Sequence, residues 1–269
     1  RASSFGATNR QRIKEESFLR FTLPLPPLEE QRRIATILDR SSHIKARYSR
    51  LRTLHQDLRF AALTKIFGEP GTWASRWEMG TIGDIAESIQ YGTSSKASAT
   101  GAFKILRMGN ITMQGELDLR DLKYIDLTPE EVPKYTTRRG DLLFNRTNSL
   151  DQVGKTGLVN TDEPLAVAGY LVRLRLRAGI SPQFVSAYLN SSYGKELRRN
   201  RAKLAVNQAN ISASQLTKIP IAVPPKEKQD EYESLIESLS SHRDLLNHSL
   251  STAEGLIGSL QSRAFRGEL

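Results

Sequence analysis

The sequence predicts a mixed α/β (α+β) domain together with two long antiparallel helices that pair as a coiled coil. Two observations predict this architecture: an internal repeat whose copies each contain a long helix, and a change to short strands and turns between the copies. A shift of 198 residues aligns Asn9 with Asn207 and Pro26-Pro27 with Pro224-Pro225. Because the residue class is also kept between these identities, we expect both copies to share one local structure.

The pattern of each copy predicts a short strand, then a Pro-Pro dipeptide, then a long helix that ends at Gly. The alternation at Phe21-Leu23-Leu25 and at Ile219-Ile221-Val223 has period two, which predicts a half-buried strand. No Pro or Gly interrupts Leu28 to Phe67, so the first helix is expected to be about 60 Å long. The second helix is expected from about Lys226 to Arg266.

Apolar residues recur in heptads along both helices, which predicts pairing with each other or with copies in another chain. In the second helix the seam is expected at Tyr232, Leu239, Leu246, Ala253 and Leu260, and at Leu235, His242, Ser249 and Leu256. The repeat places the first-helix seam at Ile37, Ile44, Leu51 and Leu58, alongside Ile34, Ser41, Tyr48, His55 and Ala62. We expect the seam histidines to set the register rather than to bind a ligand. Antiparallel packing is expected because an inserted domain returns the chain to the first helix.

The segment from about Trp73 to Ala205 has a different pattern, with many Gly-containing turns between short alternating stretches. Leu171 to Leu176 is one such stretch, and it predicts a strand. Residues Ser181 to Asn190 and Gly194 to Lys203 are expected to be helical. This pattern predicts a separate globular unit between the two long helices.

The overall charge favours a polyanionic partner. Thirty-nine Lys and Arg against 29 Asp and Glu give a net charge of +10, so nucleic acid is the first partner to consider. The absence of cysteine excludes disulfides, thiolate metal sites and cysteine nucleophiles, and no histidine pair has metal-ligand spacing. The longest mainly apolar stretch, Leu165 to Val172, is too short to span a membrane. The chain starts without Met or an apolar signal core, so we expect a cytoplasmic location and consider a fragment of a longer chain.

No enzymatic motif is complete in the sequence. Gly154-Lys155-Thr156 resembles the end of a phosphate-binding P-loop, but Ser149 stands where the first Gly of that loop is required. Motifs for nucleophile elbows, dinucleotide binding and amino-methyl transfer are also missing. We therefore expect no catalytic residue, no cofactor and no metal.

Polar and basic residues on three predicted loops are of the types that contact base edges and phosphates. We expect Arg146 and Lys96 to contact the nucleic acid, and Asn148, Ser95 and Gln152 to help to choose bases. The complete set of expected nucleic-acid-binding residues is Tyr91, Thr93, Ser94, Ser95, Lys96, Arg107, Asn110, Arg146, Asn148, Ser149, Gln152, Lys155 and Lys203. Single loops of this kind are often solvated turns, but three in one basic domain favour nucleic acid.

The most specific motif of the sequence is Asn207-x3-Ile211-x4-Leu216-x2-Ile219-Pro220-Ile221-x-Val223-Pro224-Pro225-x-Glu227-x-Gln229. It resembles the segment that joins a target-recognition domain to a long helix in the specificity subunits of type I restriction-modification systems. Trp77-x5-Gly83-Asp84-Ile85 resembles the start of such a domain. Gly140-Asp141-Leu142-Leu143-Phe144-x-Arg146, followed by Val153-Gly154-Lys155, resembles its middle. The resemblance covers nearly the whole chain.

The resemblance implies a non-enzymatic subunit that reads double-stranded DNA and directs methyltransferase (modification) and restriction subunits to a bipartite target. It implies a tail at residues 1–27 like the end of a preceding domain, a long helix at 28–68, a target-recognition domain at 69–225 and a second long helix at 226–269. Only one complete recognition domain is present, as in a half-subunit or a carboxy-terminal half, so we expect a homodimer. The alternative is a coiled-coil scaffold that assembles proteins without reading DNA.

Overall fold

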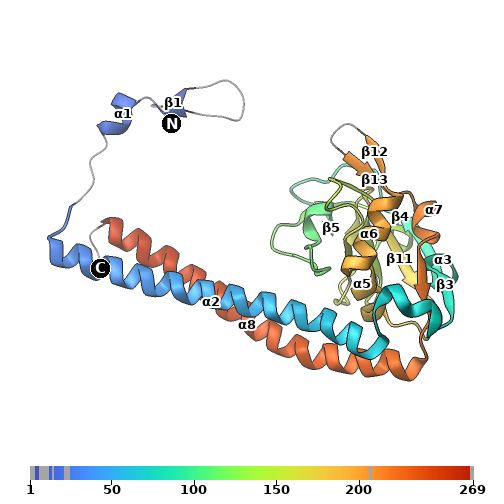
Figure 1. Ribbon diagram of the computed structural model, residues 1–269. Coiled ribbons are helices and arrows are strands. Elements are labelled where there is room, and N and C mark those ends of the chain that lie inside the picture. The colour runs from blue at the N-terminus through green and yellow to red at the C-terminus, as the bar shows by residue number, and fades with distance from the viewer. Residues whose placement is uncertain (1–3, 6–11, 14, 21–24, 206–207, 267–269) are drawn as a thin grey trace. The chain divides into compact units, whose positions relative to one another are not determined.

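The structure is a computed structural model that describes residues 4–5, 12–13, 15–20, 25–205 and 208–266 (Figure 1). Its contacts divide the chain into two compact units. The first unit comprises Arg1–Thr53 and His242–Leu269, and the second comprises Leu54–Ser241. Each long helix contributes residues to both units, so the boundary between the units falls within these helices.

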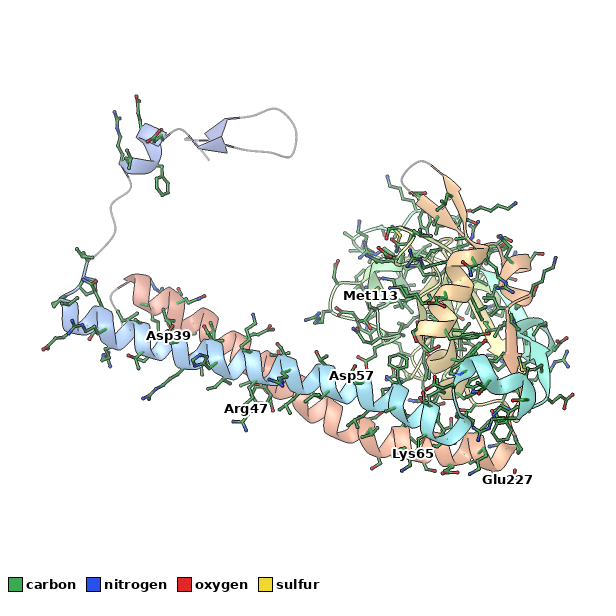
Figure 2. All side chains as sticks on the ribbon, viewed as in Figure 1. Asp39, Arg47, Asp57, Lys65, Met113 and Glu227 are labelled. Atoms are coloured by element: carbon green, nitrogen blue, oxygen red, sulfur yellow. The ribbon has the colours of Figure 1, made fainter. Side chains whose placement is uncertain are left out.

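The two long helices are α2 (Leu28–Phe67) and α8 (Lys226–Arg266), where the repeat predicts them. Figure 1 shows that the numbering rises in opposite directions along them, so they are antiparallel. The α2 helix ends at Gly68, whose φ of +82° is the left-handed conformation that favours glycine at a helix end. Charged side chains such as Asp39, Arg47 and Asp57 project from α2 into solvent (Figure 2).

Both repeat copies begin their helix in the same way. The Gln31 side chain donates a hydrogen bond to the Pro26 carbonyl at 2.8 Å, and Gln229 donates the equivalent bond to Pro224, also at 2.8 Å. Each Gln thereby closes the Pro-Pro turn over the first helical turn. In the second copy the side-chain carbonyl of Gln229 also accepts the Ser181 N–H at 2.8 Å, which ties α8 to the adjoining domain.

The buried stripe along the helices corrects half of the predicted seam. The covered positions follow alternating steps of four and three residues, including Ile34, Leu38, Ser41, Tyr48, Arg59, Ala62 and Ile66 in α2, and Tyr232, Ile236, Leu239, Leu250, Ala253, Ile257 and Leu260 in α8. The predicted positions Ile34, Ser41, Tyr48, Ala62, Tyr232, Leu239, Ala253 and Leu260 belong to this stripe.

The remaining predicted seam positions lie one residue away from the positions that are buried in the structure. Ile37 and Ser249 are half-buried, but Ile44, Leu51, Leu58, Leu235 and Leu256 are 47, 39, 53, 40 and 54% exposed. A seam with steps of three and then four residues has the same mean period as one with steps of four and then three. The periodicity of the sequence therefore does not show which of the two seams is buried. Here the packing of Ile236 decides between them, because Ile236 is 3% exposed and belongs to the buried core, whereas Leu235 is 40% exposed. The side chains of His55, His242 and Leu246 lie outside the described side chains.

The first unit also contains β1 (Ser4–Phe5), β2 (Arg12–Ile13) and α1 (Glu15–Leu19), and β1 pairs antiparallel with β2. An ion pair joins α2 to α8 within this unit, with 3.3 Å between Lys45 Nζ and Glu254 Oε1. The strand predicted at Phe21-Leu23-Leu25 lies mostly outside the described residues, since the description resumes at Leu25.

The second unit is a mixed helix and sheet domain, which confirms this part of the predicted fold class. Its central sheet has the order β4-β11-β7-β9 and is antiparallel throughout. These strands are β4 (Ala86–Tyr91), β7 (Leu142–Asn145), β9 (Thr156–Leu158) and β11 (Leu171–Leu176). The predicted strand at Leu171 to Leu176 is thus the centre of the sheet, buried almost completely.

Three smaller sheets surround the central one, with orders β10-β5-β6, β12-β13-β8 and β14-β3. Their strands are β3 (Met79–Thr81), β5 (Phe103–Leu106), β6 (Lys123–Ile125), β8 (Thr147–Asn148), β10 (Ala166–Val167), β12 (Lys203–Ala205), β13 (Gln208–Asn210) and β14 (Pro220–Ala222). The β14 strand occupies the position predicted from Ile219-Ile221-Val223. It pairs with β3, so the end of the domain closes on its beginning.

Short helices complete the domain. They are η1 (Pro70–Ser75), α3 (Ile82–Ile85), η2 (Met108–Asn110), α4 (Val132–Tyr135), α5 (Pro182–Asn190), α6 (Ser192–Arg201) and α7 (Ala213–Thr217). The predicted helices at Ser181 to Asn190 and Gly194 to Lys203 correspond to α5 and α6. Ser181 and Ser191 cap them by accepting the N–H groups of Phe184 and Gly194.

An aromatic cluster forms the core where α2 ends and α8 begins. The ring of Phe67 lies 4.6 Å from that of Phe184 and 5.6 Å from that of Tyr232, centroid to centroid. Trp73 stacks on Phe184 and on Tyr188, and its indole N–H donates to the Gly68 carbonyl at 2.8 Å. Pairs of this kind contribute about 0.5–1.5 kcal/mol each beyond burial. The cluster therefore fixes α5 against both long helices within this unit.

Among the described residues, no helix is both long enough and apolar enough to cross a membrane.

Candidate nucleic-acid interface

A groove of about 1260 Å³ opens on the surface of the second unit. Four segments distant in sequence line it: 93–97 after β4, 105–121 around η2, 146–155 after β7, and 168–170 before β11. Five cationic side chains line it against two carboxylates, so the groove has an excess of positive charge. The cations are Lys96, Arg107, Arg120, Arg146 and Lys155, and the carboxylates are Asp118 and Asp121.

Most of the residues expected to bind DNA meet in this groove. Its lining includes Thr93, Ser94, Ser95, Lys96, Arg107, Asn110, Arg146, Asn148, Gln152 and Lys155. Ser94, Ser95, Lys96 and Gln152 are exposed, whereas Thr93, Asn110 and Lys155 are buried. The exposed residues present their polar groups to solvent, and the buried ones form the inner surface.

Arg146 is held in place from two sides. The centre of its guanidinium lies 4.9 Å from the centroid of the Tyr91 ring, a cation-π contact. The Nη1 group donates to the Gly169 carbonyl at 3.5 Å, while Nε is buried without a hydrogen-bond partner among the described residues. Tyr91 is fixed in turn because its hydroxyl accepts the Ala213 N–H at 2.9 Å. The guanidinium is therefore oriented before any ligand arrives.

Asn110 has an internal role that the sequence does not reveal. Its Oδ1 accepts the Arg107 N–H at 2.9 Å, and its Nδ2 donates to the carbonyls of Asp118 and Asp121 at 3.0 and 2.9 Å. These bonds shape the loop that forms one wall of the groove. Arg107 is also engaged, since its Nη2 lies 3.3 Å from Asp121 Oδ2. The Asn110 side chain thus supports the wall.

Lys155 is 5% exposed, and its Nζ donates to Gln152 Oε1 at 3.3 Å. Burial lowers the pKa of its ammonium, because removing the charge from water disfavours the protonated form. The pKa of Asp118 at the neighbouring wall is also lowered, to about 2, but there a hydrogen bond from Arg120 favours the charged form of the carboxyl group. The groove therefore contains a desolvated cation and an acid already engaged by an arginine.

Three expected residues lie outside the lining of the groove. Tyr91 supports Arg146 instead, as described above. Ser149 is exposed in the turn after β8, where its N–H donates to Asn148 Oδ1 at 2.9 Å. Lys203 is exposed on β12, and its sheet includes β8 with Asn148.

Sequence reasoning missed several residues that line the groove. Tyr170 is 55% exposed there, and Met108, Arg120 and Asp118 line the wall around η2. The backbone carbonyl of Tyr170 accepts the Arg146 N–H at 3.0 Å, which brings the two residues together from neighbouring strands. A Gly-Tyr turn before a buried strand was the one signal for Tyr170, and it is too common to be specific.

The fold and the groove define a mixed helix and sheet domain that follows one long helix, precedes another and presents a basic groove. A profile described as "Type I restriction modification DNA specificity domain" matches residues 2–49 and 74–254 of the chain. The chain therefore belongs to the family of type I restriction-modification DNA specificity domains.

Individual relatives agree with this assignment. The chain is 28% identical over 290 residues to the type I restriction enzyme EcoKI specificity subunit of Escherichia coli K12, covering 100% of this chain and 62% of that protein. It is 26% identical over 287 residues to the StySPI specificity subunit of Salmonella potsdam, again covering 100% and 62%. The chain thus spans less than two thirds of the length of these curated relatives.

A solved structure supports the fold. The S subunit of a type I restriction-modification system from M. genitalium superposes with a TM-score of 0.57 at 16% identity, covering 98% of this chain and 68% of that one. At this identity the likeness establishes the fold alone.

Proposed function

We propose that the chain recognises a specific DNA sequence and directs partner subunits of a type I restriction-modification system to it. The observation that carries this proposal is the groove, in which three polar and basic segments meet beside the prearranged guanidinium of Arg146. Groove residues of these types make the hydrogen bonds that read base edges and hold phosphates. Membership of the specificity-domain family supports the same function.

We assign DNA reading to a target-recognition domain at residues 69–225 and a spacer role to the helices at 28–68 and 226–269. Residues 1–27 then correspond to the end of a preceding recognition domain. The alternating four-three burial along α2 and α8 supports a coiled-coil spacer, because such a seam keeps two helices in contact over many turns. A stiff spacer holds two DNA-reading domains at a fixed separation.

The proposed partners are double-stranded DNA, methyltransferase subunits, a restriction subunit and a second copy of the chain. One domain reads a short half-site, which discriminates poorly against the competing sites of a genome. A homodimer on a two-part palindromic target removes this difficulty. Exposed Ile44 and Leu51, seven residues apart on α2, support association with another subunit through this helix. The proposed location is the cytoplasm, where such a target is accessible.

The proposed role is recognition without catalysis, so the bond-making chemistry belongs to the partner subunits. A coiled-coil scaffold that does not bind DNA would account for the long helices, but it would not explain why polar and basic residues cluster in the groove. The groove therefore favours the DNA reader over the scaffold.

The experiment that tests this function is selection of duplexes from a random library by the chain together with its modification subunit. We expect a bipartite consensus, and we expect tight binding to a cognate duplex but weak, salt-sensitive binding to a scrambled one. Binding with no sequence preference at any salt concentration contradicts the proposal. Light scattering tests the homodimer, and a 30 kDa monomer that persists with DNA and modification subunits present would exclude it.

A further inference from the structure

The Gly154-Lys155-Thr156 motif occupies a rigid position at the groove. The Gly154 N–H donates to the Asn145 carbonyl at 2.6 Å, and the Asn145 N–H donates to the Lys155 carbonyl at 3.0 Å, so the motif is paired with the end of β7. Gly154 has a φ of +78°, and a Cβ there would lie 2.5 Å from Arg198 Cδ. The backbone that carries Lys155 is therefore closely confined.

The ammonium of Lys155 lacks an anionic partner inside the protein. Among the described residues, Nζ has one hydrogen-bond partner, the neutral Gln152 amide oxygen, and no carboxylate oxygen within 4.0 Å. The two carboxylates of the groove are engaged by arginines, with 2.6 Å between Asp118 and Arg120 and 3.3 Å between Asp121 and Arg107. A buried cation without a counter-charge opposes folding, because its hydration is lost without compensation.

We propose that Lys155 is the centre of an anion site on the inner surface of the groove and binds one phosphate of the DNA backbone. This inference rests on the proposed function, and it assigns to Lys155 a phosphate contact rather than a base contact. A desolvated ammonium gains most from a full negative charge, whereas the acceptor atoms of a base edge carry only partial charges. The neighbouring cations Lys96, Arg107, Arg120 and Arg146 line the same groove and add to its positive potential.

The site also couples DNA binding to protonation. In the free protein burial lowers the pKa of Lys155, and a bound phosphate raises that pKa again by supplying the missing charge. At pH values between the pKa of Lys155 in the free protein and its pKa in the DNA complex, DNA binding is therefore accompanied by uptake of a proton. Affinity is expected to be constant at pH values below the free pKa and to fall as the pH rises through it.

The test compares Lys155→Met and Lys155→Arg with the wild type, each in complex with its modification subunit, on cognate and scrambled duplexes. The Met variant keeps an unbranched chain without the charge, and we expect it to lose about tenfold or more in affinity on both duplexes. The slope of log affinity against log salt should fall by about 0.9, the value for one phosphate. The Arg variant should restore the slope and should remove the decline in affinity at alkaline pH, because its charge persists there.

The matched control is Lys104→Met, because Lys104 is an exposed lysine of the same domain, paired with Glu163 outside the groove. It should leave affinity and salt slope unchanged. Thermal unfolding provides a second measurement, since removal of an unpaired buried cation should leave Lys155→Met at least as stable as the wild type.

Two results would overturn the inference. One is a Lys155→Met variant with wild-type affinity and salt slope on both duplexes. The other is a loss confined to the cognate duplex with an unchanged salt slope, which would make Lys155 a base reader. A wild-type complex that does not distinguish the two duplexes instead contradicts the proposed function, so the two failures are distinguishable.

Discussion

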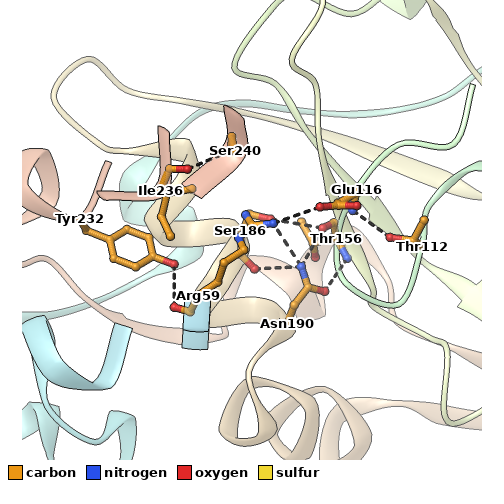
Figure 3. A network of polar contacts seen from close by, with 9 residues as sticks. All are labelled: Arg59, Thr112, Glu116, Thr156, Ser186, Asn190, Tyr232, Ile236 and Ser240. Atoms are coloured by element: carbon orange, nitrogen blue, oxygen red, sulfur yellow. Dashed lines mark hydrogen bonds and ion pairs between the residues drawn. The ribbon is translucent and has the colours of Figure 1, made fainter. Parts of the chain in front are cut away.

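The guanidinium of Arg59 on α2 lies 3.5 Å from the carboxylate of Glu116, measured from Nη1 to Oε1, and so joins the helix to the loop that walls the groove (Figure 3). The backbone carbonyl of Arg59 accepts the Tyr232 hydroxyl from α8 at 3.3 Å. On the other side, Asn190 of α5 binds both backbone groups of Thr156, the residue after Lys155. These contacts connect the ends of both long helices with the groove inside a single unit.

We predict that the Arg59–Glu116 pair contributes to stability because both side chains are largely covered, at 14 and 25% exposure. A double-mutant cycle with Arg59→Met and Glu116→Gln should give a coupling free energy of about 0.5–2 kcal/mol in denaturant unfolding. The control is the exposed Lys228–Glu231 pair on α8, for which about 0.2–0.5 kcal/mol is expected. Equal coupling in both cycles would contradict this role for Arg59.

The corrected helix seam predicts opposite outcomes for two adjacent residues. Ile236 is 3% exposed and should cost about 2–5 kcal/mol of unfolding free energy when replaced by Ala. Leu235 is 40% exposed, and its replacement by Ala should cost about 0.5 kcal/mol or less. The comparison is made by urea unfolding of the two variants, and the reverse order would restore the seam predicted from periodicity.

Tyr91 is predicted to act on DNA through Arg146 rather than directly. Tyr91→Leu removes the ring beneath the guanidinium and should weaken cognate binding by about 0.5–2 kcal/mol in free energy. Tyr91→Phe keeps the ring, so it should retain most of the affinity. Arg146→Ala should cost about 1–3 kcal/mol on the cognate duplex. In Arg146→Ala, a further Tyr91→Leu change should have little effect on affinity, and an additive loss would show that Tyr91 acts independently.

Tyr232 should make stability depend on alkaline pH. Its burial raises the pKa of the phenol from 10.0 to about 12, so the folded protein keeps the proton that the unfolded chain releases near pH 10. The contribution of the protonated Tyr232 phenol to the free energy of unfolding is therefore complete below pH 10 and is lost between about pH 10 and 12. Over this range the free energy of unfolding falls by up to about 1.4 kcal/mol per pH unit.

The measurement is the difference in unfolding free energy between the wild type and Tyr232→Phe from pH 8 to 11. The difference should shrink as the pH rises, because the phenylalanine variant has no proton to release at this position. A constant difference for Tyr232→Phe would contradict the assigned burial effect.

The sequence by itself determined the parts of the architecture that depend on local pattern. The repeat and the uninterrupted run from Leu28 to Phe67 were sufficient for the long helices, because helix formation follows from spacing and the absence of breakers. Glycine turns and residue types also pointed to the three loops that meet in the groove, and the motifs pointed to the family. These features are encoded within short stretches of chain.

Tertiary structure decided which of those residues face a ligand and which support the fold. Asn110 and Gln152 are both polar loop residues. The side chain of Asn110 is buried and makes three hydrogen bonds within the protein, whereas Gln152 is exposed beside Lys155. The choice of Ile236 over Leu235 for the seam likewise depends on what packs against α8. Such outcomes depend on contacts between residues far apart in sequence, and a pattern along the chain does not contain them.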